Sequence, residues 1–299
     1  MTESENLPFV YGGLDPALSA FETSRVLIWP VPFEKTVSYG HGTEHGPRAI
    51  VDASRNLELY DEELGVETCA IGIHTLPAID AERAPAAMMQ ALEDAASKHI
   101  ATGKLLCMLG GEHSITPPVV RAHARKYSDL SVLQIDAHAD LREAYDGTPL
   151  SHACAMRRVL ETCPAVQVGI RSLSAAEAGV NTENIFFAYK IREQKNWIEQ
   201  AVAKLSANVY LTIDIDGLDP SLAPSTGTPE PGGLGWYEVL DLIRRVAAER
   251  RIVGMDLVEV SDAGAGANIT AFTAAKLIYK TLGYVFRSHI LGNLDAQHG

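Results

Sequence analysis

From residue 104 to residue 283 the chain alternates short apolar runs with longer amphipathic segments, and this alternation constrains the fold more than any other feature of the sequence. Short apolar runs bounded by turn residues indicate buried strands, whereas the segments between them have helical spacing. Strands that alternate with helices form a parallel sheet with helices on both faces. We therefore predict an α/β fold: a single-domain, three-layer α/β/α arrangement with a mostly parallel central sheet.

The predicted strands cover residues 25–29, 71–76, 104–109, 131–136, 165–170, 184–189, 208–214 and 252–258. The predicted helices begin at about residue 47 and then cover residues 84–100, 114–127, 150–161, 174–179, 193–206, 236–250 and 269–283. Residues 1–24 contain two prolines and a Gly-Gly pair, which discourage regular structure, so we expect an N-terminal arm over the surface. Residues 25–299 show no linker or low-complexity tract, and we expect them to form one catalytic domain.

Composition argues against several classes of function. The formal net charge of −13 disfavours nucleic acid and anionic membrane surfaces as partners and is compatible with a small cationic ligand. The first residues lack the basic and apolar regions of a signal peptide, and no apolar run is long enough to span a membrane. We therefore expect a cytoplasmic protein. The four cysteines show no CxxC spacing, which favours reduced structural thiols over disulfides.

Three of the predicted strands are followed by groups of His and Asp. These groups are GGEHS at residues 110–114, DAHAD at residues 136–140 and DID at residues 214–216. The two carboxylates of DID would leave the same face of an extended strand end and repel each other unless a cation lies between them. Alone, this segment would read as a solvated Asp-Gly turn. Because ligands bind at the carboxyl ends of parallel strands, the three groups together favour a metal site.

The composition of this site narrows the choice of metal. Oxygen-rich ligand sets without cysteine suit Mn²⁺, whereas structural Zn²⁺ usually takes thiolates and imidazoles. Six side chains are too many for one tetrahedral ion, and two ions that share carboxylates can activate a water molecule. We therefore predict two Mn²⁺ per subunit. The candidate ligands are His113, Asp136, His138, Asp140, Asp214 and Asp216.

Five segments between residues 110 and 260 carry a resemblance to a known family. GGEHS, DAHAD, SHACAMRR, DIDGLDPSLAPSTGTPEPGG and VEV, in this order, resemble the ureohydrolases: arginase, agmatinase, formimidoylglutamase and guanidino-acid hydrolases. The resemblance covers nearly the whole chain and is greatest to bacterial and archaeal agmatinases. It implies a dinuclear Mn²⁺ hydrolase that forms trimers or hexamers and releases urea from a guanidinium group. It also implies that Asp136 and Asp214 bind both ions.

Two further residues match the family's site. His152 corresponds to the histidine beside the metals and would act as a proton shuttle, a role that its near-neutral pKa allows; a helix-start histidine bonded to backbone is the alternative. Glu259 ends a buried strand, where a carboxylate is costly unless it is paired. The resemblance implies that it binds the substrate guanidinium, and an ion pair with an internal arginine is the alternative. Supporting roles are expected for Glu112, Arg142 and Asp256.

The segment after VEV departs from the family. Agmatinases usually continue with a proline and then a Tyr-Asp pair, whereas residues 261–270 read SDAGAGANIT. We predict hydrolysis of agmatine to putrescine and urea, and the altered segment leaves guanidinobutyrase, guanidinopropionase, arginase and guanidine hydrolase as alternatives. A catalytically silent binding or regulatory relative is disfavoured by the intact ligand set. The glycines and alanines of residues 262–268 also predict a mobile loop.

Overall fold

A computed structural model describes residues 9–262 and 268–298 of the chain. The strands are β1 (Val26–Val31), β2 (Tyr60–Asp61), β3 (Val66–Glu67), β4 (Ile73–Thr75), β5 (Leu105–Gly110), β6 (Leu130–Ile135), β7 (Ala165–Ile170), β8 (Ile185–Phe187), β9 (Asn208–Asp214) and β10 (Arg251–Val258). The α-helices are α1 (Pro16–Ser19), α2 (Gly46–Ser54), α3 (Pro85–Ala101), α4 (Thr116–Lys126), α5 (Ala155–Leu160), α6 (Ala188–Ile191), α7 (Trp197–Ala203), α8 (Trp236–Glu249) and α9 (Ile269–His298).

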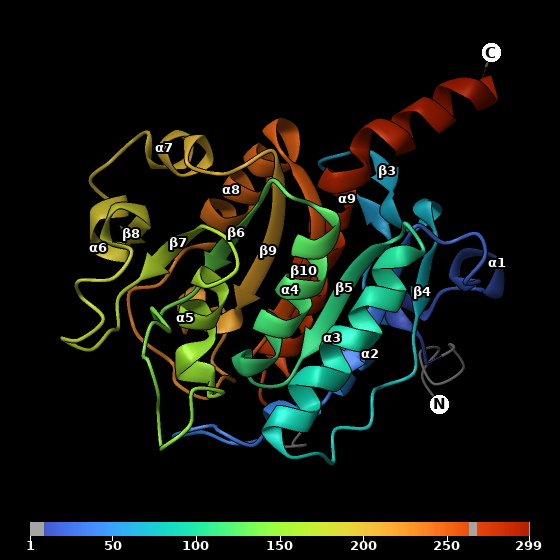
Figure 1. The fold of residues 1–299 in the computed structure, drawn as a ribbon. Helices are drawn as coiled ribbons and strands as arrows, with labels where there is room; N and C mark the ends of the chain where they lie inside the picture. Colours follow the sequence, from blue (N-terminus) through green and yellow to red (C-terminus); the bar gives the residue numbers. More distant parts are fainter. Residues whose placement is uncertain (1–8, 263–267, 299) are drawn as a thin grey trace.

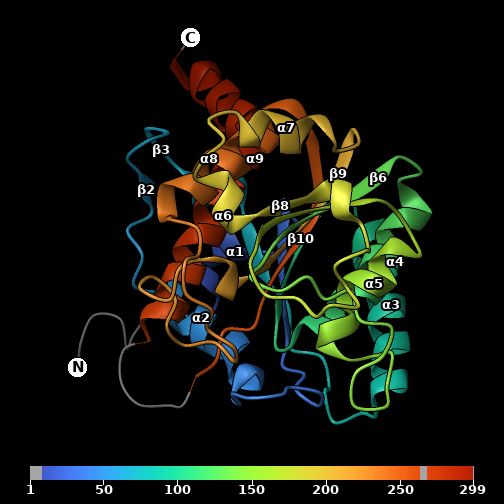
Figure 2. The ribbon, with the colours of Figure 1, turned by 90° about the vertical axis from the view of Figure 1, so that its left-hand side faces the viewer.

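Eight strands form one sheet in the order β4-β1-β5-β10-β9-β6-β7-β8, and every neighbouring pair is parallel. Helices α3, α4 and α5 cover one face of this sheet, whereas α2, α8 and α9 cover the other (Figures 1 and 2). β2 and β3 form a separate antiparallel hairpin. The predicted three-layer α/β/α fold with a parallel central sheet is confirmed.

The sheet is buried on both faces, which explains its apolar strands. In β5, Leu106 and Met108 join the core beneath α3 and α4, whereas Cys107 and Leu109 join the core beneath α2 and α9. Successive side chains of a strand point to opposite faces, so a strand covered on both sides reads as a continuous apolar run. All four cysteines of the chain are buried and unpaired, as predicted.

Several predicted elements have different bounds. The prediction of a helix at residues 174–179 is wrong, because this segment forms a turn. The buried Glu177 carboxylate stabilises the turn by accepting hydrogen bonds from the Leu141 and Ser174 amides (2.9 and 2.7 Å). The helix predicted at residues 193–206 shortens to α7. In contrast, α9 continues to His298 because no proline interrupts it, and its end projects from the body (Figure 1). Among the described helices, none is long and apolar enough to cross a membrane.

The described part of the N-terminal arm contains a 3₁₀ turn and α1 rather than wholly irregular chain. Tyr11 is fully buried and donates a hydrogen bond to the Ala275 carbonyl in α9 (2.6 Å), and its amide donates to the Thr75 hydroxyl (2.9 Å). The Gly12 amide donates to the Ser54 hydroxyl at the end of α2 (2.8 Å). Residues 9–24 are therefore fastened to both α2 and α9.

A buried ion pair joins the small hairpin to α9. Lys280 Nζ lies 2.9 Å from Asp61 Oδ1 and 2.9 Å from Glu63 Oε2, and the side chains of Lys280 and Asp61 are 2% and 0% exposed. Lys280→Met should destabilise the protein by about 3–5 kcal/mol, because it leaves a buried carboxylate without its cation. Chemical denaturation would measure this loss. Lys276→Met, which changes a partly exposed lysine one turn earlier, should change the stability much less, and equal losses would contradict the explanation.

Candidate active site

Four neighbouring strands at the centre of the sheet deliver the candidate site residues. His113 follows β5, Asp136 follows β6, Asp214 ends β9 and Glu259 follows β10. The carboxyl ends of these parallel strands meet at one edge, where ligands bind in open α/β sheets. A cavity of about 330 Å³ opens at this edge. Its lining includes His113, His138, Asp140, His152, Asp214 and Glu259.

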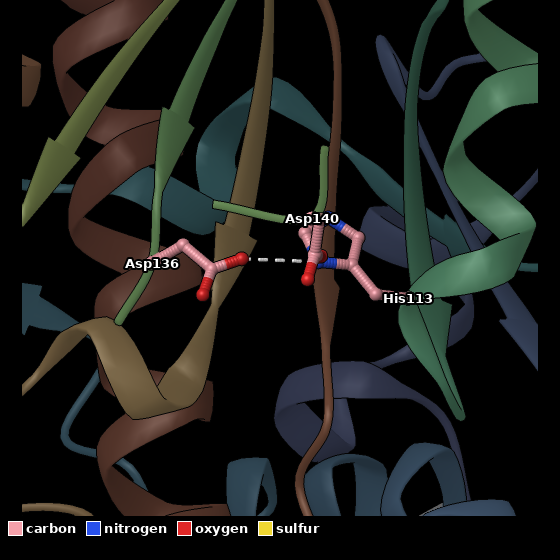
Figure 3. Close-up of side chains that lie close together, drawn as sticks. All are labelled: His113, Asp136 and Asp140. Atoms are coloured by element: carbon pink, nitrogen blue, oxygen red, sulfur yellow. Dashed lines mark ion pairs between the residues drawn. The ribbon is translucent and has the colours of Figure 1, made fainter. Parts of the chain in front are cut away.

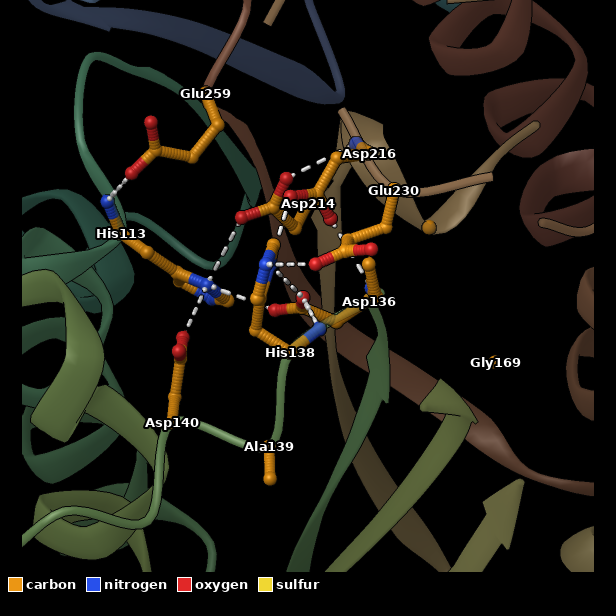
Figure 4. Close-up of polar contacts among 12 residues, drawn as sticks. His113, Asp136, His138, Ala139, Asp140, Gly169, Asp214, Asp216, Glu230 and Glu259 are labelled. Carbon is orange, nitrogen blue, oxygen red and sulfur yellow. Dashed lines mark hydrogen bonds and ion pairs between the residues drawn. The ribbon is translucent and has the colours of Figure 1, made fainter. Parts of the chain in front are cut away.

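The first group of candidate ligands surrounds one nitrogen of His113. His113 Nδ1 lies 3.2 Å from Asp136 Oδ2, 3.1 Å from Asp140 Oδ2 and 3.4 Å from Asp214 Oδ2 (Figures 3 and 4). This nitrogen is buried and has no hydrogen-bond partner among the described residues. Burial disfavours the imidazolium, but the three carboxylates raise the pKa of His113 well above its usual value. The three carboxylates therefore strongly favour a positive charge between them.

The other ring nitrogen of His113 is fixed by a buried hydrogen-bond chain. Thr212 Oγ1 donates to Asp256 Oδ1 (2.5 Å), so it can accept the proton on His113 Nε2, 2.9 Å away. Asp256 also accepts hydrogen bonds from the hydroxyls of Tyr210 and Thr116 (2.8 and 2.9 Å). In the neutral imidazole, these hydrogen bonds place the free electron pair of His113 on Nδ1, toward the three carboxylates. Partners of this kind orient metal-binding histidines.

A second group surrounds one nitrogen of His138. His138 Nδ1 lies 2.9 Å from Asp216 Oδ2 and 3.7 Å from Asp136 Oδ1 (Figure 4). Asp136 and Asp216 raise the pKa of His138 to about 12 despite its burial. His113, Asp136 and Asp140 could hold one metal ion, and Asp136, His138 and Asp216 could hold another, so the two groups share Asp136. All six candidate ligands thus lie around one location.

The carboxylates of the site repel one another. Burial, Asp216 and Asp136 raise the pKa of Asp214 well above its usual value, and burial and Asp136 raise the pKa of Asp140 to about 6. Glu259 has a strongly raised pKa because of its burial and the nearby Glu112. Divalent cations would relieve this repulsion, so the donor set fits two metal ions in charge as well as in ligand type.

The DID segment differs from the extended strand end expected from its sequence. Asp214 is the last residue of β9, but Asp216 lies in a 3₁₀ turn over Ile215–Gly217. Asp214 Oδ1 accepts a hydrogen bond from the Asp216 amide (3.0 Å), which stabilises the turn. Gly217 lies against β6, where an added Cβ would come within 2.7 Å of the Asp136 amide nitrogen. The turn, rather than an extended strand, therefore brings the two carboxylates together.

His152 lines the cavity and contacts a hydrogen-bond network formed by Thr36 and Glu112. Its Nδ1 lies 3.3 Å from Thr36 Oγ1, and Thr36 Oγ1 donates to Glu112 Oε1 (2.8 Å). Glu112 is fully buried and also accepts hydrogen bonds from the Lys35 and Thr36 amides (2.6 Å each). Because the Thr36 proton is directed to Glu112, a proton on His152 Nδ1 can be donated to Thr36. This arrangement leaves Nε2 of the neutral imidazole unprotonated.

Glu259 occupies an unusual backbone conformation directly after β10. Its φ is 64°, which is uncommon for residues other than glycine, and such conformations cluster at functional sites. Its Oε1 accepts a hydrogen bond from the His113 amide (2.7 Å). Among the described residues it makes no ion pair with an arginine, which was the alternative explanation for this buried carboxylate.

Two residues of the site were missed by sequence analysis. Arg171 directly follows β7, and its guanidinium donates to the backbone carbonyls of Asp216 (2.6 Å), Leu218 (3.3 Å) and Glu230 (2.8 Å). Glu230 lines the cavity, with its Oε1 4.0 Å from His138 Nε2 (Figure 4). The position of Arg171 at a strand end, like that of the candidate ligands, could have identified it. The proline on each side of Glu230 gave no indication of where its side chain points.

The remaining sequence candidates lie around this centre. Arg142 lines the cavity, where its Nε lies 3.7 Å from Glu177 Oε2. In the altered segment, Asn268 Nδ2 donates to the Ser261 carbonyl (2.9 Å). The predicted mobility of residues 262–268 falls mainly on residues 263–267, which lie outside the described residues.

Comparison with known proteins places the chain in a family. The sequence matches the model of the Arginase family over residues 24–283. N(1)-aminopropylagmatine ureohydrolase of Synechocystis sp. is 42% identical over 280 residues, 90% of this chain and 91% of that protein. Agmatinase of Bacillus anthracis is 38% identical over 279 residues, 88% of this chain and 92% of that protein.

The solved structures agree with these relatives. The agmatine ureohydrolase of Thermoplasma volcanium has a TM-score of 0.82 at 33% identity and covers 91% of this chain and 94% of its own. The predicted resemblance to ureohydrolases is therefore confirmed, and so is the predicted class of enzyme, an amidinohydrolase. The chain belongs to the Arginase family.

Proposed function

We propose that this protein hydrolyses the guanidino group of agmatine, producing putrescine and urea, with two Mn²⁺ bound per subunit. The observation that carries the proposal is the pair of overlapping His/Asp groups that share Asp136 at the carboxyl edge of the sheet. His113, Asp136, Asp140 and Asp214 would hold one ion, and Asp136, His138, Asp214 and Asp216 the other. When bound, such a pair of ions supplies an activated water molecule at neutral pH.

The charges of the site suit a guanidinium substrate. Two Mn²⁺ and four aspartates cancel, and an added hydroxide leaves the centre slightly negative. Glu259 supplies another carboxylate, and its Oε1 accepts a hydrogen bond from the His113 amide. A planar guanidinium can pair with such a carboxylate through two hydrogen bonds. Glu259 would therefore hold the substrate with its central carbon facing the metal ligands.

His152 would move the proton that the reaction requires. Its unprotonated Nε2 can take a proton in the cavity and deliver it to the departing amine, while Thr36 and Glu112 hold Nδ1. Burial lowers the pKa of His152, so the neutral imidazole predominates near neutral pH. The network keeps this imidazole in the tautomer that can act as a base.

A second candidate substrate is N(1)-aminopropylagmatine, which the name of one relative gives as its substrate. That relative, from Synechocystis sp., is 42% identical to this chain, compared with 38% for the agmatinase of Bacillus anthracis. Both compounds carry a guanidino group and a cationic amine. The higher identity to the Synechocystis sp. relative favours the second candidate, whereas the metal site suits either compound.

A substrate panel tests the proposed function. Urea release would be measured with agmatine, N(1)-aminopropylagmatine, arginine, 4-guanidinobutyrate, 3-guanidinopropionate and guanidine, after Mn²⁺ loading and again after chelation. We expect Mn²⁺-dependent turnover of one or both amine-bearing compounds at least about tenfold faster than that of the acids, a difference of about 1.4 kcal/mol. Preferred turnover of an acid would refute the substrate assignment. Absence of metal binding together with absence of turnover would support the silent relative instead.

A further inference from the structure

Among the carboxylates that line the cavity, Glu230 has no role in the proposed binding of the metal ions or of the guanidino group. Glu177 Oε1 accepts a hydrogen bond from the Leu141 amide, and one oxygen of Glu259 accepts from the His113 amide. In contrast, none of the described residues donates a hydrogen bond to the Glu230 side chain, and its nearest charged partner is His138 Nε2 at 4.0 Å. This distance is too long for a hydrogen bond. The carboxylate of Glu230 is 38% exposed and faces the cavity.

The backbone that carries Glu230 is held on both sides. Arg171 donates to the Glu230 carbonyl from two nitrogens (3.2 and 2.8 Å), and the same guanidinium donates to the Asp216 carbonyl. Asp219 Oδ2 accepts hydrogen bonds from the Gly232 and Gly233 amides (3.1 Å each). The adjacent prolines restrict the chain further. The backbone at Glu230 is therefore held in place, with the side chain in the cavity lining.

The charges of the lining distinguish substrates by their tail, the group at the end opposite the guanidino group, which is either a carboxylate or an ammonium. Apart from the candidate metal ligands, Arg142 is the cationic side chain of the described lining. Its Nε lies 3.7 Å from Glu177 Oε2, and its guanidinium lies over the Tyr145 ring (5.0 Å). A carboxylate tail would therefore compete with Glu177 for the Arg142 guanidinium. An ammonium tail would find Glu230. In Figure 4 Glu259 and Glu230 lie on opposite sides of Asp214, which suits a molecule with a cation at each end.

We propose that Glu230 is the specificity residue of this site, and that it selects guanidines carrying a second cationic amine. The inference rests on the proposed function, since it assumes that the guanidino group lies at the metal ligands and Glu259. Removing the charge of Glu230 should then weaken the binding of the amine and leave the hydrolytic step in place. Substrates that lack the amine should not respond to the change.

The test compares agmatine with n-butylguanidine, which has the same carbon chain without the amine. With Mn²⁺-loaded enzyme, Glu230→Gln should raise the KM and the dissociation constant for agmatine about ten- to hundredfold, as expected for the loss of a charged hydrogen bond. It should change kcat for agmatine and kcat/KM for n-butylguanidine by less than about threefold. Glu199→Gln, an exposed carboxamide substitution on α7, is the matched control and should leave all values unchanged.

Two outcomes would overturn the inference. Equal losses on both substrates, accompanied by reduced Mn²⁺ content, would show that Glu230 acts through His138, and unchanged values for agmatine would show that it has no role in selection. Failure of the proposed function is distinguishable, because it would appear as absence of urea release from the unmodified enzyme. The calorimetric dissociation constants of the two compounds would still decide the role of Glu230 in that case.

Discussion

Replacing Asp136 by Asn is expected to abolish urea release, with a loss in kcat/KM of at least about a thousandfold, or roughly 4 kcal/mol. Asp136 belongs to both candidate ligand groups, with one oxygen toward His113 and the other toward His138. Asn has the same shape but no negative charge, so it weakens both metal positions at once. Asp216 belongs to one of these groups, and Asp216→Ala should weaken one position first while leaving the fold nearly intact.

Metal content distinguishes these variants independently of activity. Elemental analysis after Mn²⁺ loading and gel filtration should give about two ions per subunit for the unmodified protein, about one for Asp216→Ala and close to none for Asp136→Asn. Exposed Asp94 on α3 provides the control, since Asp94→Asn should retain the full metal content. Full turnover by Asp216→Ala would overturn the dinuclear assignment.

Stability gives a second readout for Asp136→Asn. A metal that binds only the folded state stabilises it by about 2.7 kcal/mol when its free concentration is a hundred times the dissociation constant. The unmodified protein should therefore melt at a higher temperature with Mn²⁺ than with chelator, and Asp136→Asn should lose this difference. Without metal the variant should be somewhat less stable than the unmodified protein. Burial raises the pKa of Asp136, but His113 and His138 outweigh it and lower that pKa overall, so the folded state favours the charge that Asn lacks. A melting temperature that Mn²⁺ still raises in Asp136→Asn would contradict the assignment of Asp136 as a shared ligand.

The fold could be predicted from the sequence because the central strands are buried on both faces of the sheet. β5, β6, β9 and β10 lie between two helical layers, so each reads as a nearly continuous apolar run with clear ends. The edges were harder to predict. β8 is only Ile185–Phe187, and the turn around Glu177 depends on hydrogen bonds to the distant Leu141 amide. Such long-range contacts leave no periodic signal in the sequence.

The candidate metal ligands were predictable because their positions follow from topology. His113, Asp136 and Asp214 each lie at the end of a parallel strand, and the ends of neighbouring strands must meet. Arg171 and Glu230 were missed for a different reason. Arg171 acts through backbone carbonyls, which every residue has, so no spacing of residue types reveals its partners. Glu230 is brought to the cavity by those contacts.

His152→Ala should lower kcat by about a hundred- to ten-thousandfold while changing KM much less, as expected when a proton-transfer group is removed. The metal content should remain unchanged, because His152 Nδ1 contacts the Thr36 and Ser151 hydroxyls rather than the candidate ligands. Cys154→Ser is the matched control. Burial raises the pKa of the Cys154 thiol and so disfavours the nucleophilic thiolate, and its substitution should change kcat by less than about twofold.

The pH profile separates proton transfer from a structural role of His152. The pKa of His152 is lowered, mainly by burial, and its neutral form takes the proton. Activity of the unmodified enzyme should therefore fall as the pH drops through a value below the ordinary imidazole pKa of about 6.5. In His152→Ala this acid limb should disappear, and added imidazole should restore part of the rate. If the limb persists and imidazole has no effect, His152 only supports the cavity wall and the proton must reach the departing amine from another group.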